Sequence, residues 1–309
     1  MRFVWCFVVV FSFAASDAHR FGYSQSEQLK WKNINSDCEA GLQSPIGISG
    51  HRAIPLTMPA LEMVRYHDLL PGPLELHNNG HSASVAIPKL EEGDPKEKYV
   101  PYIFGAKLNS EYEMEALHFH WGDKNNEGSE HVINDIRFPM EMHIIHRNRK
   151  YATMEEALGY RDGLTVLGFF FQLREKENKQ LAQLVKFLPS VLDFNKRVQI
   201  NETFTLASIL PPFETMERFY TYRGSLTTPP CSEAVTWILF PDPLPVSVSQ
   251  MNKFRRLKAD EEQTLLTHNY REVQKLGPRR VFVRKLKPRG VKYNSTIHYS
   301  KWDWVTNYS

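Results

Sequence analysis

Apolar and polar residues alternate in short segments along most of this chain, and Gly, Pro and Asn residues separate the segments. An alternation with a period of two residues is typical of strands that bury one face. The clearest examples cover residues 82–87, 112–121, 133–149 and 235–240. Because no repeat and no linker interrupts them, the segments predict one β-dominated domain over residues 19–290.

Helical periodicity is found in few places. Thr153 and Glu156 form a capping box, which predicts a short helix ending near Gly159. Residues 178–191 and 247–257 carry apolar residues at helical spacing, which predicts surface helices packed on the sheet. These apolar positions are Leu181, Leu184, Val185 and Leu188 in the first segment and Met251, Phe254 and Leu257 in the second.

The chain opens with a basic residue and an apolar run at residues 3–15, followed by small residues. This pattern predicts a secretory signal peptide over residues 1–18, with cleavage after either Ser16 or Ala18. No run is long enough to span a bilayer, and residues 291–309 form no hydrophobic tail for a lipid anchor. We therefore expect a secreted, extracellular protein without a membrane span or lipid anchor.

Removal of the signal peptide takes Cys6 with it and leaves Cys38 and Cys231. In an oxidising compartment this pair is expected to form a disulfide, the alternative being two buried free thiols. A bridge that closes so long a loop would contribute on the order of 5 kcal/mol in the chain-entropy description. N-glycosylation sequons, which would make the protein a glycoprotein, begin at Asn201, Asn294 and Asn307.

The charge of the chain gives little reason to expect nucleic acid as a partner. The formal net charge is +3, and no stripe of basic and aromatic residues of the RNA-binding kind is present in the sequence. Residues 279–287 are strongly basic, but they alternate. We interpret them as an edge strand with a solvated cationic face, the alternative being a polyanion site. The basic and then aromatic residues beyond 290 have no assigned role.

Two histidines on one predicted strand suggest a metal site. His118 and His120 are two residues apart, so their side chains point to the same face, about 6.5–7 Å apart along the strand. His143 lies in a second alternating segment. If the two strands are neighbours, three neutral nitrogens converge and leave a fourth tetrahedral position open, as in catalytic zinc sites. A His-x-His pair alone is weak evidence, since the chain has twelve histidines.

Several longer motifs resemble the α-class carbonic anhydrases, in order and with similar spacing, over nearly the whole mature chain. The matching segments are Gln43-Ser44-Pro45-Ile46, Asn78-Asn79-Gly80-His81, His118-Phe119-His120-Trp121-Gly122, Gly128-Ser129-Glu130-His131, Glu141-Met142-His143 and Gly224-Ser225-Leu226-Thr227-Thr228-Pro229-Pro230. Asn269 and Arg271 resemble the family's C-terminal structural pair.

The resemblance implies a fold, a metal and a reaction. The fold would be a large, twisted, mostly antiparallel sheet of about ten strands with a few short surface helices. His118, His120 and His143 would hold Zn²⁺ at the base of a cone-shaped cleft. The enzyme would be a zinc lyase, a carbonate dehydratase, that interconverts carbon dioxide and bicarbonate by zinc-hydroxide attack.

The resemblance also implies roles around the metal. Thr227 would accept the hydroxide's hydrogen and donate its own toward Glu130, which orients the hydroxide. His81 would carry the product proton to buffer, for which an unperturbed pKa near 6.5 is suited. Tyr23 would order the water chain between zinc and His81. The structural alternatives are a loop residue for Thr227, a surface histidine for His81 and an aromatic wedge for Tyr23.

A hydrophobic wall beside the metal would receive the apolar substrate. The substrate-binding positions that match the family are Ile145, Val166, Leu226, Thr228, Val235 and Trp237. The apolar members among them are equally explained as core residues. The expected partner is the small-molecule substrate, carbon dioxide or bicarbonate.

One position near the first ligand departs from the family. There, Gln normally lies two residues before that ligand and accepts its second N–H, whereas this chain has Ala116, which cannot accept. We expect a water or another side chain to replace it, with modestly weaker zinc retention. Glu141 is expected to contact His120.

Two alternatives to the enzyme remain. The first is a catalytically weak, carbonic anhydrase-related binding or matrix protein, although the three histidines, Thr227, Glu130 and His81 are all present. The second is a zinc hydrolase for esters, but the chain lacks the His-Glu-x-x-His helix of metalloproteases.

Overall fold

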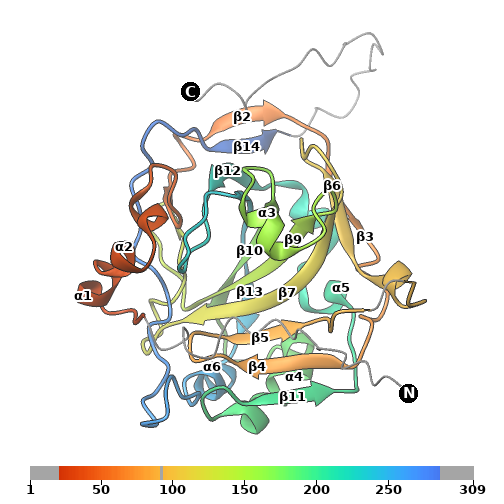
Figure 1. Ribbon diagram of the computed structural model, residues 1–309, viewed down its shortest axis with the longest axis vertical. Coiled ribbons are helices and arrows are strands. Elements are labelled where there is room, and N and C mark those ends of the chain that lie inside the picture. The colour runs from red at the N-terminus through yellow and green to blue at the C-terminus, as the bar shows by residue number, and fades with distance from the viewer. Residues whose placement is uncertain (1–20, 91–92, 286–309) are drawn as a thin grey trace, which may run out of the picture.

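The computed structural model describes residues 21–90 and 93–285. Within these residues, one sheet of twelve strands runs through the molecule (Figure 1). Its strands follow the order β11-β4-β5-β7-β9-β10-β13-β12-β14-β2, and β6 joins β3 to β7. The bounds are β2 (Ile54–Thr57), β3 (Leu61–Val64), β4 (Leu74–Asn78), β5 (Ala83–Ala86), β6 (Tyr102–Gly105), β7 (Tyr112–Trp121), β9 (Met140–Asn148), β10 (Leu164–Leu173), β11 (Arg197–Ile200), β12 (Tyr220–Gly224), β13 (Val235–Val246) and β14 (Phe282–Lys285). Strands β1 (Gly47–Ile48) and β8 (Val132–Ile133) form a separate parallel pair.

Most pairs in the sheet are antiparallel, which confirms the predicted fold class. The exceptions are β10 with β13 and β14 with β2, which are parallel. The sheet is therefore mixed and somewhat larger than the predicted ten strands. The cone-shaped cleft stays a prediction.

The helices are few and short, as expected. They are α1 (Gln25–Gln28), α2 (Trp31–Ile34), α3 (Met154–Leu158), α4 (Lys179–Val185), α5 (Leu206–Ile209) and α6 (Val248–Phe254), with 3₁₀ turns η2 (Ser36–Glu39), η3 (Glu97–Tyr99), η4 (Leu188–Val191) and η5 (Phe213–Glu217). Thr153 caps α3 as predicted, since its side chain accepts the N–H of Glu156. The helix expected over residues 178–191 divides into α4 and η4, and that expected over 247–257 ends at Phe254.

Two strand predictions are corrected by the structure. The segment 133–149 is not one strand: Ile133 ends β8, and β9 begins only at Met140, because Asn134 and Asp135 have a left-handed backbone that turns the chain. The basic segment is not an edge strand: β14 lies between β12 and β2. Arg279, from the same segment, is buried and donates to the backbone oxygens of Leu42 and Lys275.

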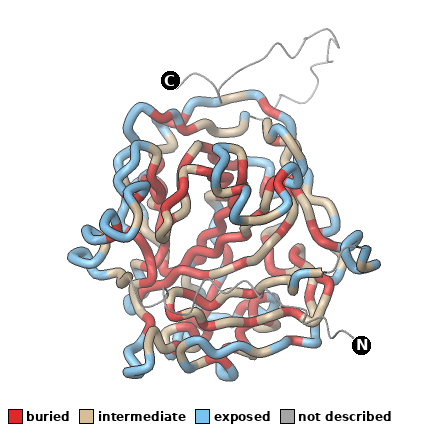
Figure 2. The backbone as a smooth tube through the Cα atoms, viewed as in Figure 1, coloured by how far each residue is buried: buried red, intermediate tan, exposed pale blue. Residues whose placement is uncertain are grey.

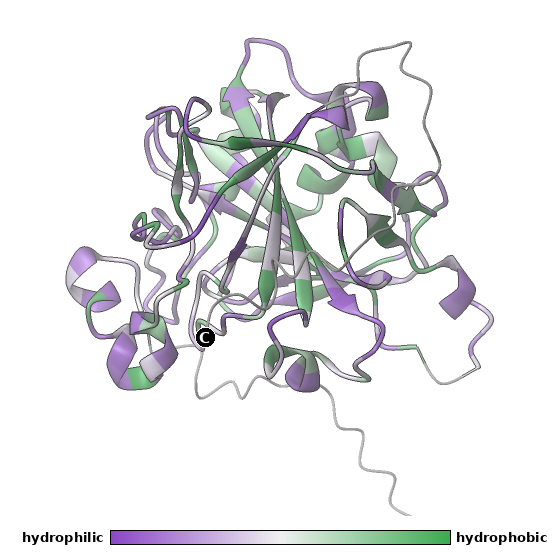
Figure 3. Ribbon diagram, turned by 90° about the horizontal axis from the view of Figure 1, so that it is seen from above, coloured by the Kyte–Doolittle hydropathy of each residue, from purple (hydrophilic) through white to green (hydrophobic). Residues whose placement is uncertain are grey.

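Buried residues follow the central strands of the sheet, and exposed residues the outlying turns and short helices (Figure 2). Seen from above, hydrophobic residues likewise concentrate along the crossing strands (Figure 3). Leu117 and Phe119 of β7 and Met142 of β9 belong to the larger apolar cluster. The residues between them point to the opposite face, because side chains alternate along a strand. The site therefore lies on that opposite face.

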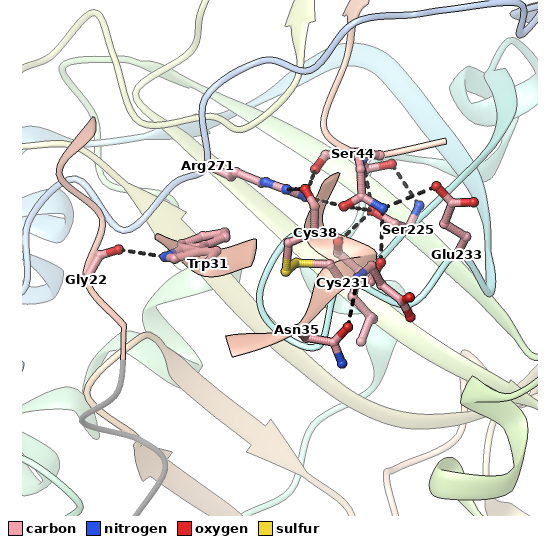
Figure 4. Close-up of a disulfide and its surroundings, with 12 residues drawn as sticks. Gly22, Trp31, Asn35, Cys38, Ser44, Ser225, Cys231, Glu233 and Arg271 are labelled. Atoms are coloured by element: carbon pink, nitrogen blue, oxygen red, sulfur yellow. Dashed lines mark hydrogen bonds between the residues drawn. A yellow bond between two sulfur atoms is a disulfide. The ribbon is translucent and has the colours of Figure 1, made fainter. Parts of the chain in front are cut away.

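The expected disulfide joins Cys38 and Cys231, which are 193 residues apart in sequence. Figure 4 shows Arg271 beside the bridge, where its guanidinium donates to the backbone oxygens of Cys38 and Ser44, each at 2.9 Å. The disulfide joins the N-terminal segment to the loop of residues 224–231, and Arg271 joins the same segment to the C-terminal part of the domain. Arg271 therefore has the structural role predicted for it.

Candidate metal centre

Strands β7 and β9 bring the three predicted ligands together. His118 and His143 are directly opposite in the antiparallel register, and His120 follows on the same face as His118. Nε2 of His118 lies 3.0 Å from Nε2 of His120 and 3.3 Å from Nδ1 of His143. We call these residues the three-histidine group. One ring nitrogen from each lies within 4.8 Å of the others.

Two of the rings are oriented by hydrogen bonds on their far side. Nδ1 of His120 donates to the carbonyl oxygen of Asn269 at 2.7 Å. Nε2 of His143 donates to the carboxylate of Glu141 at 2.7 Å. Because these nitrogens carry the hydrogens, the lone pairs of the other two face one another across the group. Converging lone pairs require a cation between them, which fits a zinc site.

Glu141 does not contact His120, which corrects the prediction. Its carboxylate accepts from His143 and also from Nδ1 and the backbone N–H of His131, at 2.7 and 2.8 Å. Glu141 and His143 share one face of β9, so the carboxylate reaches the ring two residues away. His131, whose Nε2 accepts from the hydroxyl of Tyr222 at 2.6 Å, was not identified from the sequence as a partner.

The first ligand has no comparable support. In the described part of the chain, no group forms a hydrogen bond with Nδ1 of His118. Ala116 leaves that nitrogen without the amide expected there, and no described side chain has replaced it. Asn269, by contrast, orients His120 through its backbone and accepts the N–H of Trp121 through its side chain. The sequence marked Asn269 only as structural.

Burial keeps the three rings neutral. It lowers the pKa of His118 well below its usual value, and it lowers the pKa of His120 to about 4. It also lowers the pKa of His143, although Glu141 acts in the opposite sense. Burial alone would raise the pKa of Glu141. The neighbouring His131 and His143 have the larger effect and hold the pKa of this carboxyl well below its usual range. The site thus pairs neutral nitrogen donors with one buried carboxylate behind them.

Glu130 turns an unpaired oxygen toward the three-histidine group. Its Oε1 accepts the backbone N–H of Arg271 at 2.9 Å. Its Oε2 is buried without a hydrogen-bond partner among the described residues, 3.5 Å from Nε2 of His120 and 3.9 Å from Nδ1 of His143. Burial raises the pKa of Glu130 to about 7, while His143 and the nearby Thr227 hydroxyl act against the rise. A buried acceptor beside three nitrogen ligands again fits a cation.

Tyr23 and His81 lie near this site in one aromatic group. Burial raises the pKa of Tyr23 well above its usual value, and the charge of Glu130 adds to the rise. Its hydroxyl is buried without a hydrogen-bond partner in the described ranges. The ring of His81 stacks on Phe21 at a centroid distance of 3.9 Å. Phe21 was missed from the sequence, where its only signal is an aromatic residue two positions before Tyr23.

The predicted wall residues also come together. Val166, Val235 and Trp237 belong to one buried apolar cluster, against which Ile145 and Leu226 pack. The Trp237 ring lies 4.8 Å from that of His143, so this cluster adjoins the three-histidine group. Thr227 is buried, and the next residue, Thr228, accepts the N–H of Cys231 at 2.8 Å. An apolar surface therefore lies next to the polar site.

A second group of metal-ligand types was not predicted. Asp123, Glu127 and His268 also bring ligand atoms within 4.8 Å of one another. Nε2 of His268 lies 3.0 Å from the Asp123 carboxylate, and these side chains are 39% and 47% exposed. We call this the exposed cluster.

A large mixed sheet that carries three neutral histidines, with a buried carboxylate behind them, defines a zinc enzyme of the carbonic anhydrase class. Residues 26–285 match the family described as eukaryotic-type carbonic anhydrase, and the chain belongs to that family. The family uses zinc, and the three-histidine group is the corresponding feature of this chain.

Individual relatives support the same assignment. Carbonic anhydrase 7 of Mus musculus is 35% identical over 266 residues, which cover 84% of this chain and 96% of the relative. Carbonic anhydrase 15 of Mus musculus is 33% identical over 81% of this chain and 78% of the relative. The mitochondrial carbonic anhydrase 5A of Homo sapiens is 34% identical over 78% and 75%, respectively. Among the described residues, no helix has the length and apolar character needed to cross a membrane.

Proposed function

We propose that this chain is a secreted zinc enzyme that catalyses the reversible hydration of carbon dioxide to bicarbonate and a proton. The observation that carries the proposal is the convergence of three neutral ring nitrogens, together with the unpaired Oε2 of Glu130. Nε2 of His118, Nε2 of His120 and Nδ1 of His143 would hold the zinc. When bound, zinc acts as a Lewis acid that makes water acidic enough to ionise near neutral pH, an effect for which carbonic anhydrase is the standard example.

Thr227 and Glu130 would orient the reacting oxygen. The backbone N–H of Arg271 occupies Oε1 of Glu130, which leaves Oε2 to accept a hydrogen bond. A threonine hydroxyl that donates to this carboxylate presents only its lone pairs to the reacting site. Thr227 would then accept a hydrogen there and favour one orientation of the attacking oxygen.

Carbon dioxide would enter against the apolar cluster beside His143. Ile145, Val166, Leu226, Val235 and Trp237 offer it contacts without competing hydrogen bonds. Thr228 would supply the polar contact at the edge of this surface. The arrangement favours a small apolar substrate. The charged product is more stable in water and would leave this surface.

His81 would carry the proton away from the site. Phe21 holds its ring by stacking, and the backbone N–H of His81 donates to Asn79 at 2.9 Å. Tyr23, whose ring centroid lies 5.9 Å from that of His81, would order water between the two ends of the path. Histidine suits this role because both of its protonation states are accessible near neutral pH.

Secretion is part of the proposal. The Cys38–Cys231 bridge suits an oxidising compartment, and Asn201 is exposed, as a glycosylated residue must be. The predicted signal peptide, the sequons at Asn294 and Asn307 and the tail 291–309 lie outside the described residues. Expression in secreting cells, with analysis of the medium for a processed and glycosylated chain, tests this part.

Stopped-flow hydration of carbon dioxide by the purified protein, before and after chelation, tests the activity. We expect one zinc per chain and hydration that disappears on chelation and returns with zinc. Zinc at full occupancy without hydration would instead support the binding or matrix protein. His81→Ala should depress turnover in weak buffer, with rescue by imidazole and unchanged zinc content. His51→Ala, on an exposed histidine elsewhere, is the matched control.

A further inference from the structure

A groove of about 390 Å³, lined by none of the three histidines, lies between the start of β3 and the 3₁₀ turn η5. Its apolar lining comes from Leu61, Met63, Phe213 and Met216. The ring of His67 lies 4.9 Å from that of Phe213 and continues this apolar surface. The groove is thus shaped by side chains from two segments distant in sequence.

Three carboxylates surround the apolar lining. Glu62, Glu214 and Glu217 line the groove and are exposed. None of them forms an ion pair with another described residue. The one guanidinium in the lining, that of Arg284, donates to the backbone oxygens of Met58 and Glu217. Three negative groups against one positive group leave the groove acidic, which suits a segment that carries both cations and apolar side chains.

The chain itself leads to this groove. Strand β14 runs parallel to β2 (Figure 1), with Lys285 opposite Thr57. Both strands therefore run toward Met58, whose backbone oxygen accepts from Arg284. Arg284, the next-to-last residue of β14, is part of the groove lining. Residue 286 therefore follows directly from the groove wall.

The residues that follow have the complementary composition. Residues 286–309 contain four basic residues, Lys287, Arg289, Lys292 and Lys301, against one acidic residue, Asp303. Three of the four lie within seven residues of Lys285, a reach of about 23 Å in an extended chain. Val291 and Tyr293 supply apolar groups in the same stretch.

We propose that residues 286–293 bind in this groove, with their cations against Glu62, Glu214 and Glu217 and their apolar side chains on the lining. Single contacts between exposed charges are weak. Covalent attachment nevertheless gives the segment a high effective concentration at a groove that begins where it leaves the sheet. The otherwise unassigned basic stretch of the tail thereby gains a role, that of fixing the C-terminal end to the domain.

Zero-length carbodiimide cross-linking of the full chain, read by mass spectrometry, tests the proposal. We expect Lys287 or Lys292 to be joined to Glu62, Glu214 or Glu217. Mixing normal and ¹⁵N-labelled protein separates links within one chain from links between two. The variant E214K/E217K should lower the yield at least tenfold and leave zinc content and hydration unchanged. The control E155K/E262K reverses two exposed carboxylates elsewhere and should leave the yield as it is.

A charge exchange makes the test independent of folding. Adding K287E/R289E to E214K/E217K restores opposite charges. Cross-links should then form again between the same positions, with the lysine in the groove and the glutamate in the tail. High salt should suppress links in both forms, since screening weakens contacts between exposed charges. Links that join two copies, or that spread evenly over exposed carboxylates, would overturn the proposal, as would their complete absence.

Discussion

The three-histidine group and the exposed cluster have the same simple geometry but differ in their surroundings. In both, three ligand-type side chains bring atoms within 4.8 Å of one another. His120 and Glu130 are 2% and 0% exposed, whereas His268 and Asp123 in the exposed cluster are 39% and 47% exposed. The two groups therefore have their ligand atoms equally close together, but only the three-histidine group is buried.

The partners of the ligands differ as well. In the three-histidine group, Asn269 and Glu141 accept the far-side hydrogens of two rings, which directs the lone pairs inward. In the exposed cluster, Nε2 of His268 lies 3.0 Å from the Asp123 carboxylate, and its Nδ1 lies 3.3 Å from the hydroxyl of Tyr270. No hydrogen bond therefore directs a lone pair of His268 toward Glu127, whose Oε1 is 3.7 Å away. A metal site thus depends on what lies behind the ligands, and this difference can be tested.

Loss of a ligand should give the largest contrast. His143→Ala should abolish stable zinc binding and reduce hydration more than about 100-fold, because two remaining ligands cannot hold a catalytic zinc. His268→Ala should leave zinc content and hydration unchanged. Metal analysis after dialysis and stopped-flow assays check both. Loss of zinc in the second variant would mean that the exposed cluster holds part of the metal.

Removing the charge behind a ligand should have a smaller effect. Glu141→Gln should weaken zinc binding by about 10–100-fold, because the carboxylate no longer supports His143. Asp123→Asn, the matched change at the 47% exposed carboxylate of the exposed cluster, should leave zinc affinity unchanged and alter stability by less than about 0.5 kcal/mol. Competition with a chelator measures the first quantity and urea unfolding the second. Equal effects of the two changes would show that support from behind the ligands does not distinguish the two groups.

Burial of histidine should also appear in the dependence of stability on pH. Burial lowers the pKa of His146 to about 3, whereas a free imidazole has a pKa of about 6.5. Below pH 6.5 the unfolded chain therefore binds a proton that the folded chain does not, so stability falls as pH falls. Between pH 6.5 and 5 the wild type should lose about 1.5 kcal/mol more than His146→Gln.

Urea unfolding of the zinc-loaded protein at the two pH values gives this difference directly. His51→Gln, on an exposed histidine, should follow the wild type. If His146→Gln also follows the wild type, His146 is not the source of the acid sensitivity.

The unsupported first ligand should give the smallest effect. Ala116→Gln would place an amide where Nδ1 of His118 has no partner among the described residues. Zinc should then dissociate more slowly, by up to about tenfold, the lower end of the range for such partners. Ala152→Gln, on an exposed alanine outside β7 and β9, is the control. Unchanged dissociation in the first variant would show that His118 does not need this partner.

The sequence by itself determined the features that depend on local periodicity. His118 and His120 had to share a face because strands alternate, and Thr153 had to cap a helix because its hydroxyl reaches the N–H three residues on. The long motifs indicated the family, and two cysteines in the expected mature chain left one possible bridge. Each of these inferences needed only neighbouring residues, composition or motif order.

Tertiary structure alone decided which distant groups meet. The carboxylate of Glu141 accepts from His131 because packing places that ring beside it. The orientation of His120 likewise depends on the carbonyl of Asn269. The place of β14 inside the sheet depended on its pairing with β2, more than two hundred residues earlier. Such contacts are set by register and side-chain packing across the whole sheet, which local patterns of polarity do not encode.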